Sequence, residues 1–148
     1  MTFLKIILLL ISLTILSSCS KEVEKIEYGV DQCEHCKMTL TDKKYGALIF
    51  TKKGKSYKFD ATECMLDYVK EEKINDNEIE KYFVINLTEP GVLTDASEAT
   101  YLISPELRSP MGENISAFKN NSDADKYQTQ YGGEILSWND LKNKFTGK

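Results

Sequence analysis

Short apolar segments alternate with polar ones through the first half of the chain. Residues 45–50 and 56–59 read as two strands, and the lysine-rich turn between them contains Gly54, so the pattern predicts a β-hairpin. The spacing of Met65, Tyr68 and Val69 predicts a helix over residues 61–72, with Asp60 and Glu63 forming a capping box at its start. The largely apolar residues 82–87 predict a third strand, which we expect to be central.

The second half of the chain repeats this order of elements. Three strands are predicted over residues 100–103, 115–118 and 134–136. One helix is predicted from Ser122 to about residue 131, ended by Gly132, and another over residues 138–145 with Ser137 as its N-cap. Strand–strand–helix–strand therefore occurs twice, over about 38–88 and 99–145. We predict an α+β fold in which these two small units pack as one compact globular body, spanning residues 32–148.

The N-terminal segment has the pattern of an export signal. Residues 3–16 are almost wholly apolar apart from Lys5, and Leu16-Ser17-Ser18-Cys19 then resembles a lipoprotein cleavage box. The uncharged run of residues 6–16 is too short for a membrane helix, which needs about 20 residues. We expect a lipoprotein signal peptide over residues 1–18, acylation of Cys19, and a polar tether over residues 19–31 that holds the domain at a membrane.

The net charge of the mature chain and the residue after the cleavage site indicate its partners and its location. Loss of Lys5 with the signal leaves 18 basic against 23 acidic side chains, a net charge of −5, which argues against nucleic acid as a partner. Ser20 follows the acylated cysteine, where an aspartate would suggest retention in the inner membrane. We therefore expect an extracytoplasmic, lipid-anchored protein facing the periplasm, with the outer membrane favoured over the inner one.

Soft metal donors are concentrated around a pair of cysteines. The segment Cys33-Glu34-His35-Cys36-Lys37-Met38 holds two thiols, the only imidazole and a thioether, and Pro110-Met111-Gly112 supplies another thioether in a turn. With Cys19 acylated, Cys33, Cys36 and Cys64 remain, and because their number is odd, at least one thiol cannot pair within the chain. Thiolates and thioethers are ligands that favour Cu(I) over harder ions.

Other interpretations of the cysteine pair remain open. A structural disulfide between Cys33 and Cys36 suits an oxidising compartment. A thiol-redox motif usually lies where a strand meets a helix, and no helix pattern follows here. A structural zinc site needs four ligands, for which only Cys64 and His35 remain.

These motifs together resemble the NosL family, the accessory lipoproteins that deliver copper for nitrous oxide reductase. The resemblance covers most of the mature chain, and the family commonly has a glycine where this chain has Lys37. It rests on the lipobox ending at Cys19, Cys33-x-x-Cys36-x-Met38, the Gly54 turn, Phe59-Asp60 leading into Cys64-Met65, and Pro110-Met111-Gly112 followed by Ala117-Phe118.

The resemblance implies Cu(I) binding outside the cytoplasm and transfer of copper to maturation proteins of an ABC-type system, or to the cuproenzyme itself. We expect Cys36, Met38 and Met111 as the core ligands, with Cys33 assisting. Cys64, Met65 and His35 are secondary candidates. One ion per chain or one shared in a homodimer would both satisfy this donor set.

No nucleophile–base pair, phosphate loop or carboxylate dyad is apparent, so we expect a binding protein and not an enzyme. The alternatives are a periplasmic thiol-redox lipoprotein that uses Cys33 and Cys36, and a zinc-binding or disulfide-stabilised structural lipoprotein.

Overall fold

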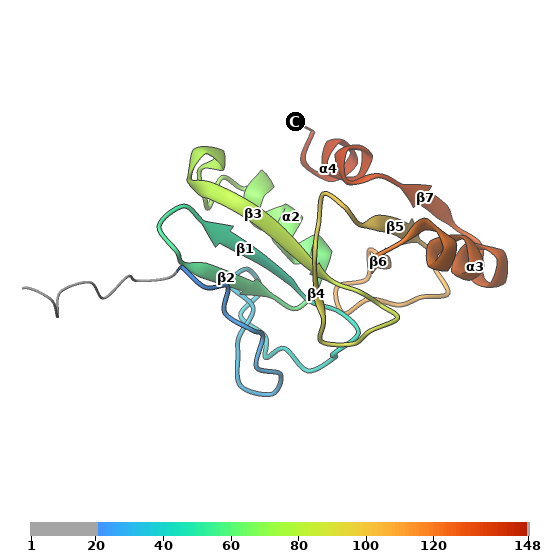
Figure 1. The fold of residues 1–148 in the computed structure, drawn as a ribbon, viewed down its shortest axis with the longest axis horizontal. Helices are drawn as coiled ribbons and strands as arrows, with labels where there is room; N and C mark the ends of the chain where they lie inside the picture. The colour runs from blue at the N-terminus through green and yellow to red at the C-terminus, as the bar shows by residue number, and fades with distance from the viewer. Residues whose placement is uncertain (1–20, 148) are drawn as a thin grey trace, which may run out of the picture.

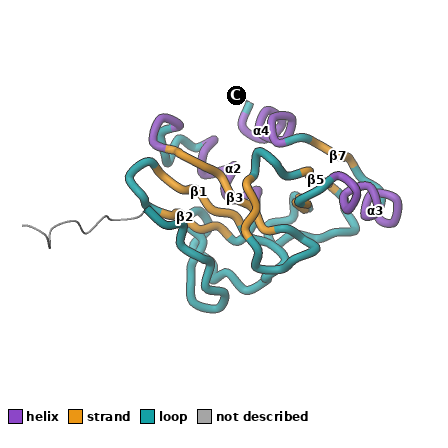
Figure 2. The backbone as a smooth tube through the Cα atoms, viewed as in Figure 1, coloured by secondary structure: helices purple, strands orange, loops and turns teal. Residues whose placement is uncertain are grey.

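Two small antiparallel sheets and three α-helices form the body of the protein (Figures 1 and 2). The structure is a computed structural model that describes residues 21–147. The predicted signal peptide, Cys19 and Ser20 lie outside the described residues. Among residues 21–147, no helix has the length and apolar character needed to cross a bilayer.

The predicted strand–strand–helix–strand order is confirmed in both units. The first unit consists of β1 (Ala47–Thr51), β2 (Ser56–Phe59), α2 (Thr62–Lys70), the short 3-10 helix η1 (Asp76–Glu78), β3 (Ile79–Ile85) and β4 (Leu93–Asp95). The second consists of β5 (Thr100–Ile103), β6 (Ile115–Phe118), α3 (Asn121–Tyr131), β7 (Glu134–Leu136) and α4 (Trp138–Thr146).

The two sheets share one topology. The strand orders are β2-β1-β3-β4 and β6-β5-β7, so the first strand of each unit lies between the second and the third. All pairs within the sheets are antiparallel. The third strand of the first unit, β3, is interior as expected, because β4 pairs with its free edge. The α+β prediction of two similar units is therefore confirmed.

The main core lies between the units. Alternate residues of β5 and β6 point to opposite faces of their sheet, as strand geometry requires. Tyr101 and Ile115 join the main core with β1, α2 and α4, whereas Leu102 and Phe118 join a smaller cluster under α3. The second sheet is therefore covered on both faces, which explains why its short strands are nearly continuous in apolar character.

Direct contacts join the units into one body. Helix α4, at the top of Figure 1, packs against α2 of the first unit. Past the end of β3, the Leu87 N–H donates to the Ala117 carbonyl of β6 at 2.8 Å. The predicted single globular body follows from these contacts.

Helix starts differ from the sequence prediction. The N-cap of α2 is Ala61, with no side-chain cap hydrogen bond, so the predicted capping box of Asp60 and Glu63 is wrong. Both carboxylates are buried and face other partners, described below. Helix α3 is capped by Asn120 and not by Ser122, whereas Ser137 caps α4 as predicted.

The folded body begins before the predicted end of the tether at residue 31. Ile26 and Tyr28 pack against the core, and the Tyr28 hydroxyl donates to the Tyr45 carbonyl at 2.8 Å. Gly46 has a φ of 138°, and a Cβ on it would lie 2.9 Å from that hydroxyl. The close approach needs this glycine. Strand β1 starts at Ala47 instead of residue 45.

Candidate metal centre

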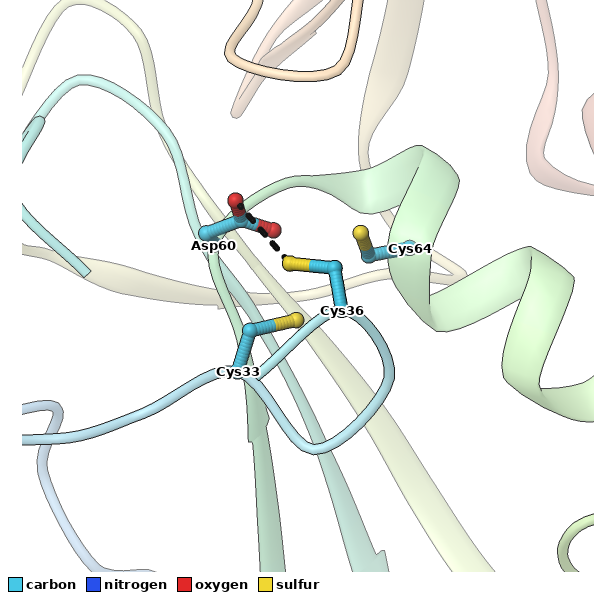
Figure 3. A group of neighbouring side chains, drawn as sticks. All are labelled: Cys33, Cys36, Asp60 and Cys64. Carbon is cyan, nitrogen blue, oxygen red and sulfur yellow. Dashed lines mark hydrogen bonds between the residues drawn. The ribbon is translucent and has the colours of Figure 1, made fainter. Parts of the chain in front are cut away.

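Three thiols and one carboxylate converge where the N-terminal loop meets the start of α2 (Figure 3). Cys33 and Cys36 come from the loop, Asp60 follows β2, and Cys64 lies in the first turn of α2. Their ligand atoms all lie within 4.8 Å of one another. This separation allows one small ion to reach all four donors.

Backbone hydrogen bonds shape the loop that carries the first two thiols. Gln32 and Thr39 form an isolated antiparallel bridge, and inside it the Cys33 N–H donates to the Met38 carbonyl at 2.8 Å. The Lys37 N–H donates back to the Cys33 carbonyl at 3.0 Å. This tight loop brings the Cys33 and Cys36 thiols close to Asp60 and Cys64, and the Cys36 thiol points toward Asp60 (Figure 3).

The three thiols are free and differ in accessibility. Cys33 and Cys64 are buried, with exposed fractions of 0% and 1%, whereas Cys36 is only half-buried. Cys36 is therefore the thiol through which an ion would enter or leave the cluster.

Hydrogen bonds to the Cys33 sulfur favour its thiolate form. The Cys64 thiol donates to the Cys33 sulfur, and backbone N–H groups around it also donate, so the pKa of Cys33 falls to about 6 although burial opposes this. The same hydrogen bond, together with burial, holds the pKa of Cys64 far above its usual range. Burial is also the main cause that raises the pKa of Cys36.

Asp60 is the one residue of the cluster that the sequence pattern did not predict as a donor. Its carboxylate is buried, the Cys36 thiol lies 3.7 Å from its Oδ2, and its Oδ1 has no hydrogen-bond partner. The signal was present in the sequence, because Asp60 precedes Cys64 by four residues. The spacing of Asp60 and Glu63 instead favours helix capping.

The structure places the other predicted donors in different surroundings. Met38 and Met111 are exposed, at 55% and 41%, in loops. Met65 is fully buried among the core residues. His35 is outside the converging group; its Nε2 lies 3.3 Å from a Glu71 carboxylate oxygen and its buried Nδ1 has no partner.

The three thiols suit a soft metal ion, and with Asp60 as a fourth donor the cluster suits Zn(II) as well as Cu(I). Thiolates bind both Cu(I) and Zn(II), and thioethers favour Cu(I). Three thiols and a carboxylate also make the tetrahedral set that zinc takes. The sequence offers Cys64 and His35 to complete such a set, whereas in the structure Asp60, and not His35, joins the three thiols.

Comparisons with known proteins agree with the fold. The NosL family model matches residues 26–146. The crystal structure of the copper chaperone NosL from Shewanella denitrificans has a TM-score of 0.67 and 19% identity, and the alignment covers 80% of this chain and 94% of that one. No curated protein sequence matches the chain. With its family model matched from Ile26 to Thr146, the chain belongs to the NosL family.

Proposed function

We propose that the protein is a Cu(I)-binding metallochaperone. The observation that carries the proposal is the convergence of three thiols from two segments, with the half-buried Cys36 as their accessible member. Membership of the NosL family supports it, as does the structural similarity to the copper chaperone NosL from Shewanella denitrificans.

We propose Cys36, Met38 and Met111 as core ligands, with Cys33 assisting. The convergence of the thiols raises Cys64 from a secondary candidate to an equal of Cys33. The buried sulfurs of Cys33 and Cys64 assist from within the fold, while the exposed thioethers of Met38 and Met111 add softness without charge and can be withdrawn when the ion is passed on. Each thiol that binds the ion gives up its proton, so affinity rises with pH.

A competition experiment tests the proposal. The reduced protein without its acyl chains (residues 20–148) is titrated against a Cu(I) chelator and, separately, against a Zn(II) chelator. We expect one Cu(I) per chain, or one shared by two chains, and preference for Cu(I) over Zn(II). Tight zinc uptake with no Cu(I) binding would contradict the proposal and favour a structural zinc protein built on Asp60 and the thiols.

Met111 gives the most specific mutational test. Because its side chain is exposed, Met111→Ala removes little packing and should weaken Cu(I) binding while leaving the thermal midpoint unchanged. Val92→Ala, which truncates another exposed apolar side chain, is the matched control and should leave binding unchanged. Equal Cu(I) affinity in both variants would remove Met111 from the ligand set.

We further propose that acylated Cys19 anchors the protein outside the cytoplasm. There it would deliver copper for nitrous oxide reductase or a related cuproenzyme, either to an ABC-type maturation system or to the enzyme itself. Cys19→Ala should yield an unprocessed or soluble product. Unchanged mass and membrane fractionation of that variant would refute the anchor.

A thiol-redox role is the second candidate, favoured by the low pKa of Cys33 beside two other thiols. Disulfide exchange with a glutathione couple, in the absence of copper, measures it. A structural Cys33–Cys36 disulfide, by contrast, would resist reduction by that couple.

A further inference from the structure

The loop that carries Met111 is closed around one buried serine. Residues 110–113 are exposed, whereas Ser109 is 8% exposed. The Ser109 hydroxyl accepts from the Asn114 N–H at 2.9 Å, and the Ser109 carbonyl accepts from the Gly112 N–H at 3.2 Å. Met111 therefore lies at the tip of a compact turn whose base is Ser109.

The same hydroxyl joins this turn to the helix of the thiol cluster. It donates to Oε1 of Glu63, which is 1% exposed and directly precedes Cys64 in the first turn of α2. Ser109 and Glu63 belong to different structural units. The hydrogen bond therefore links the turn of Met111 in the second unit to the helical turn of Cys64 in the first.

Burial of the Glu63 carboxylate lowers the stability of the folded protein. Its second oxygen, Oε2, is buried without a hydrogen-bond partner, and burial raises the pKa of the carboxyl. A half-satisfied buried carboxylate destabilises a protein relative to an apolar side chain of similar volume. Packing alone does not explain a glutamate at this position.

We propose that Glu63 and Ser109 are positioning residues that hold the Met111 thioether against the thiol cluster. The inference rests on the proposed Cu(I) binding. The hydrogen bond confines the turn that carries Met111, so less conformational freedom is lost when the thioether binds the ion. Partners that orient metal ligands are typically worth about 10- to 100-fold in metal affinity.

Two matched pairs of variants separate positioning from stability. Leucine and glutamine are both good helix formers and similar in volume to glutamate, but only Glu63→Gln keeps an oxygen that accepts from Ser109. Ser109→Ala removes the hydroxyl, and Ser104→Ala is its control, because Ser104 is also buried but donates to the Tyr131 carbonyl of α3.

Cu(I) affinity and the NMR shift of the Met111 methyl group on Cu(I) addition are measured for each variant. We expect Glu63→Leu and Ser109→Ala to lose about tenfold in affinity and most of the methyl shift. Glu63→Gln and Ser104→Ala should resemble the wild type. In a Met111→Ala background, Glu63→Leu should cause no further loss, since it acts through the thioether. Wild-type affinity and methyl shift in Glu63→Leu would overturn the inference.

Amide hydrogen exchange in the metal-free protein tests the tether independently of copper. The Asn114 amide should exchange faster in Glu63→Leu than in Glu63→Gln, because the turn is released. Equal rates would overturn the tether even if the wild type binds Cu(I). A wild type that binds no Cu(I) would refute the proposed function, and the exchange rates would still decide whether Glu63 holds the turn.

Discussion

Lys37 adopts a left-handed backbone conformation between Cys36 and Met38, with a φ of 63°. That conformation costs an L-residue with a side chain roughly 1–2 kcal/mol, and glycine avoids the cost. The NosL-like pattern has glycine here, and the backbone explains that preference. This chain therefore forms the tight turn of residues 33–38 with backbone strain at Lys37.

Replacing Lys37 with glycine should therefore stabilise the protein. We expect Lys37→Gly to raise the free energy of unfolding by about 0.5–1 kcal/mol, since relief of strain exceeds the greater freedom of the unfolded chain. Loss of the exposed Lys37–Glu34 ion pair matters little. Urea unfolding measures the change. Lys53→Gly, in an exposed turn, is the control and should destabilise. A less stable Lys37→Gly protein would show that the loop is not strained.

Cys64 should control the ionisation of Cys33. The Cys64 thiol is the largest cause that lowers the Cys33 pKa to about 6. Cys64→Ala removes this donor, so the midpoint of thiolate formation should move to higher pH, whereas Cys64→Ser retains a hydroxyl donor and should keep it low. Thiolate ultraviolet absorbance of the reduced, metal-free protein reports the midpoint. The same midpoint in the alanine and serine variants would exclude the Cys64 hydrogen bond as the cause.

At the scale of one element, the first turn of helix α2 carries two buried side chains that face different parts of the fold. Cys64 faces the thiol cluster, while Glu63 is buried toward Ser109 of the other unit. Burial raises the Glu63 pKa above its ordinary value of 4.5, so the folded protein holds this proton more tightly than the unfolded chain. Stability consequently falls as pH rises from about 4.5 through the raised pKa.

Glu63→Gln should remove this pH dependence. We expect the variant to be more stable than the wild type at neutral pH, because no charge has to be buried, and the difference should vanish in acid below the ordinary pKa. Urea unfolding across pH 4 to 8 measures it. Glu80→Gln, at an exposed position of β3, should leave the pH profile unchanged. A stability difference that stayed constant with pH would exclude ionisation of Glu63 as the cause.

At the scale of the whole molecule, Trp138 joins the two sheets. Its ring centroid lies 5.2 Å from that of Tyr82 on β3 and 5.8 Å from that of Tyr101 on β5. Trp138 is 8% exposed and begins α4, the helix that packs on α2. One side chain thus contacts both sheets and orients the terminal helix.

Truncating this side chain should loosen the joint between the units. We expect Trp138→Ala to lower the free energy of unfolding by about 3–5 kcal/mol, and Trp138→Phe, which keeps an aromatic ring, to cost clearly less. Urea unfolding monitored by far-ultraviolet circular dichroism measures both. Similar stabilities for the alanine and phenylalanine variants would show that aromatic contact does not hold the sheets together.

The sequence by itself determined the local elements. Short apolar segments bounded by turn residues predicted β2, β5, β6 and β7 at their observed bounds, because a strand ends where the chain turns. The three-residue β4 was missed, because it contains a single apolar residue, Leu93. The motif around Cys33 and Cys36 and its resemblance to NosL likewise followed from sequence alone, and the family match confirmed the resemblance.

Only the tertiary structure decided which distant side chains meet. Asp60 and Glu63 fit a capping box by spacing, but the fold turns Asp60 toward the thiols and Glu63 toward Ser109. Burial of Cys64 beside Cys33 likewise depends on how α2 packs against the N-terminal loop. Periodicity records which face of an element is buried, whereas the partner across that face is set by the packing of segments far apart in the chain.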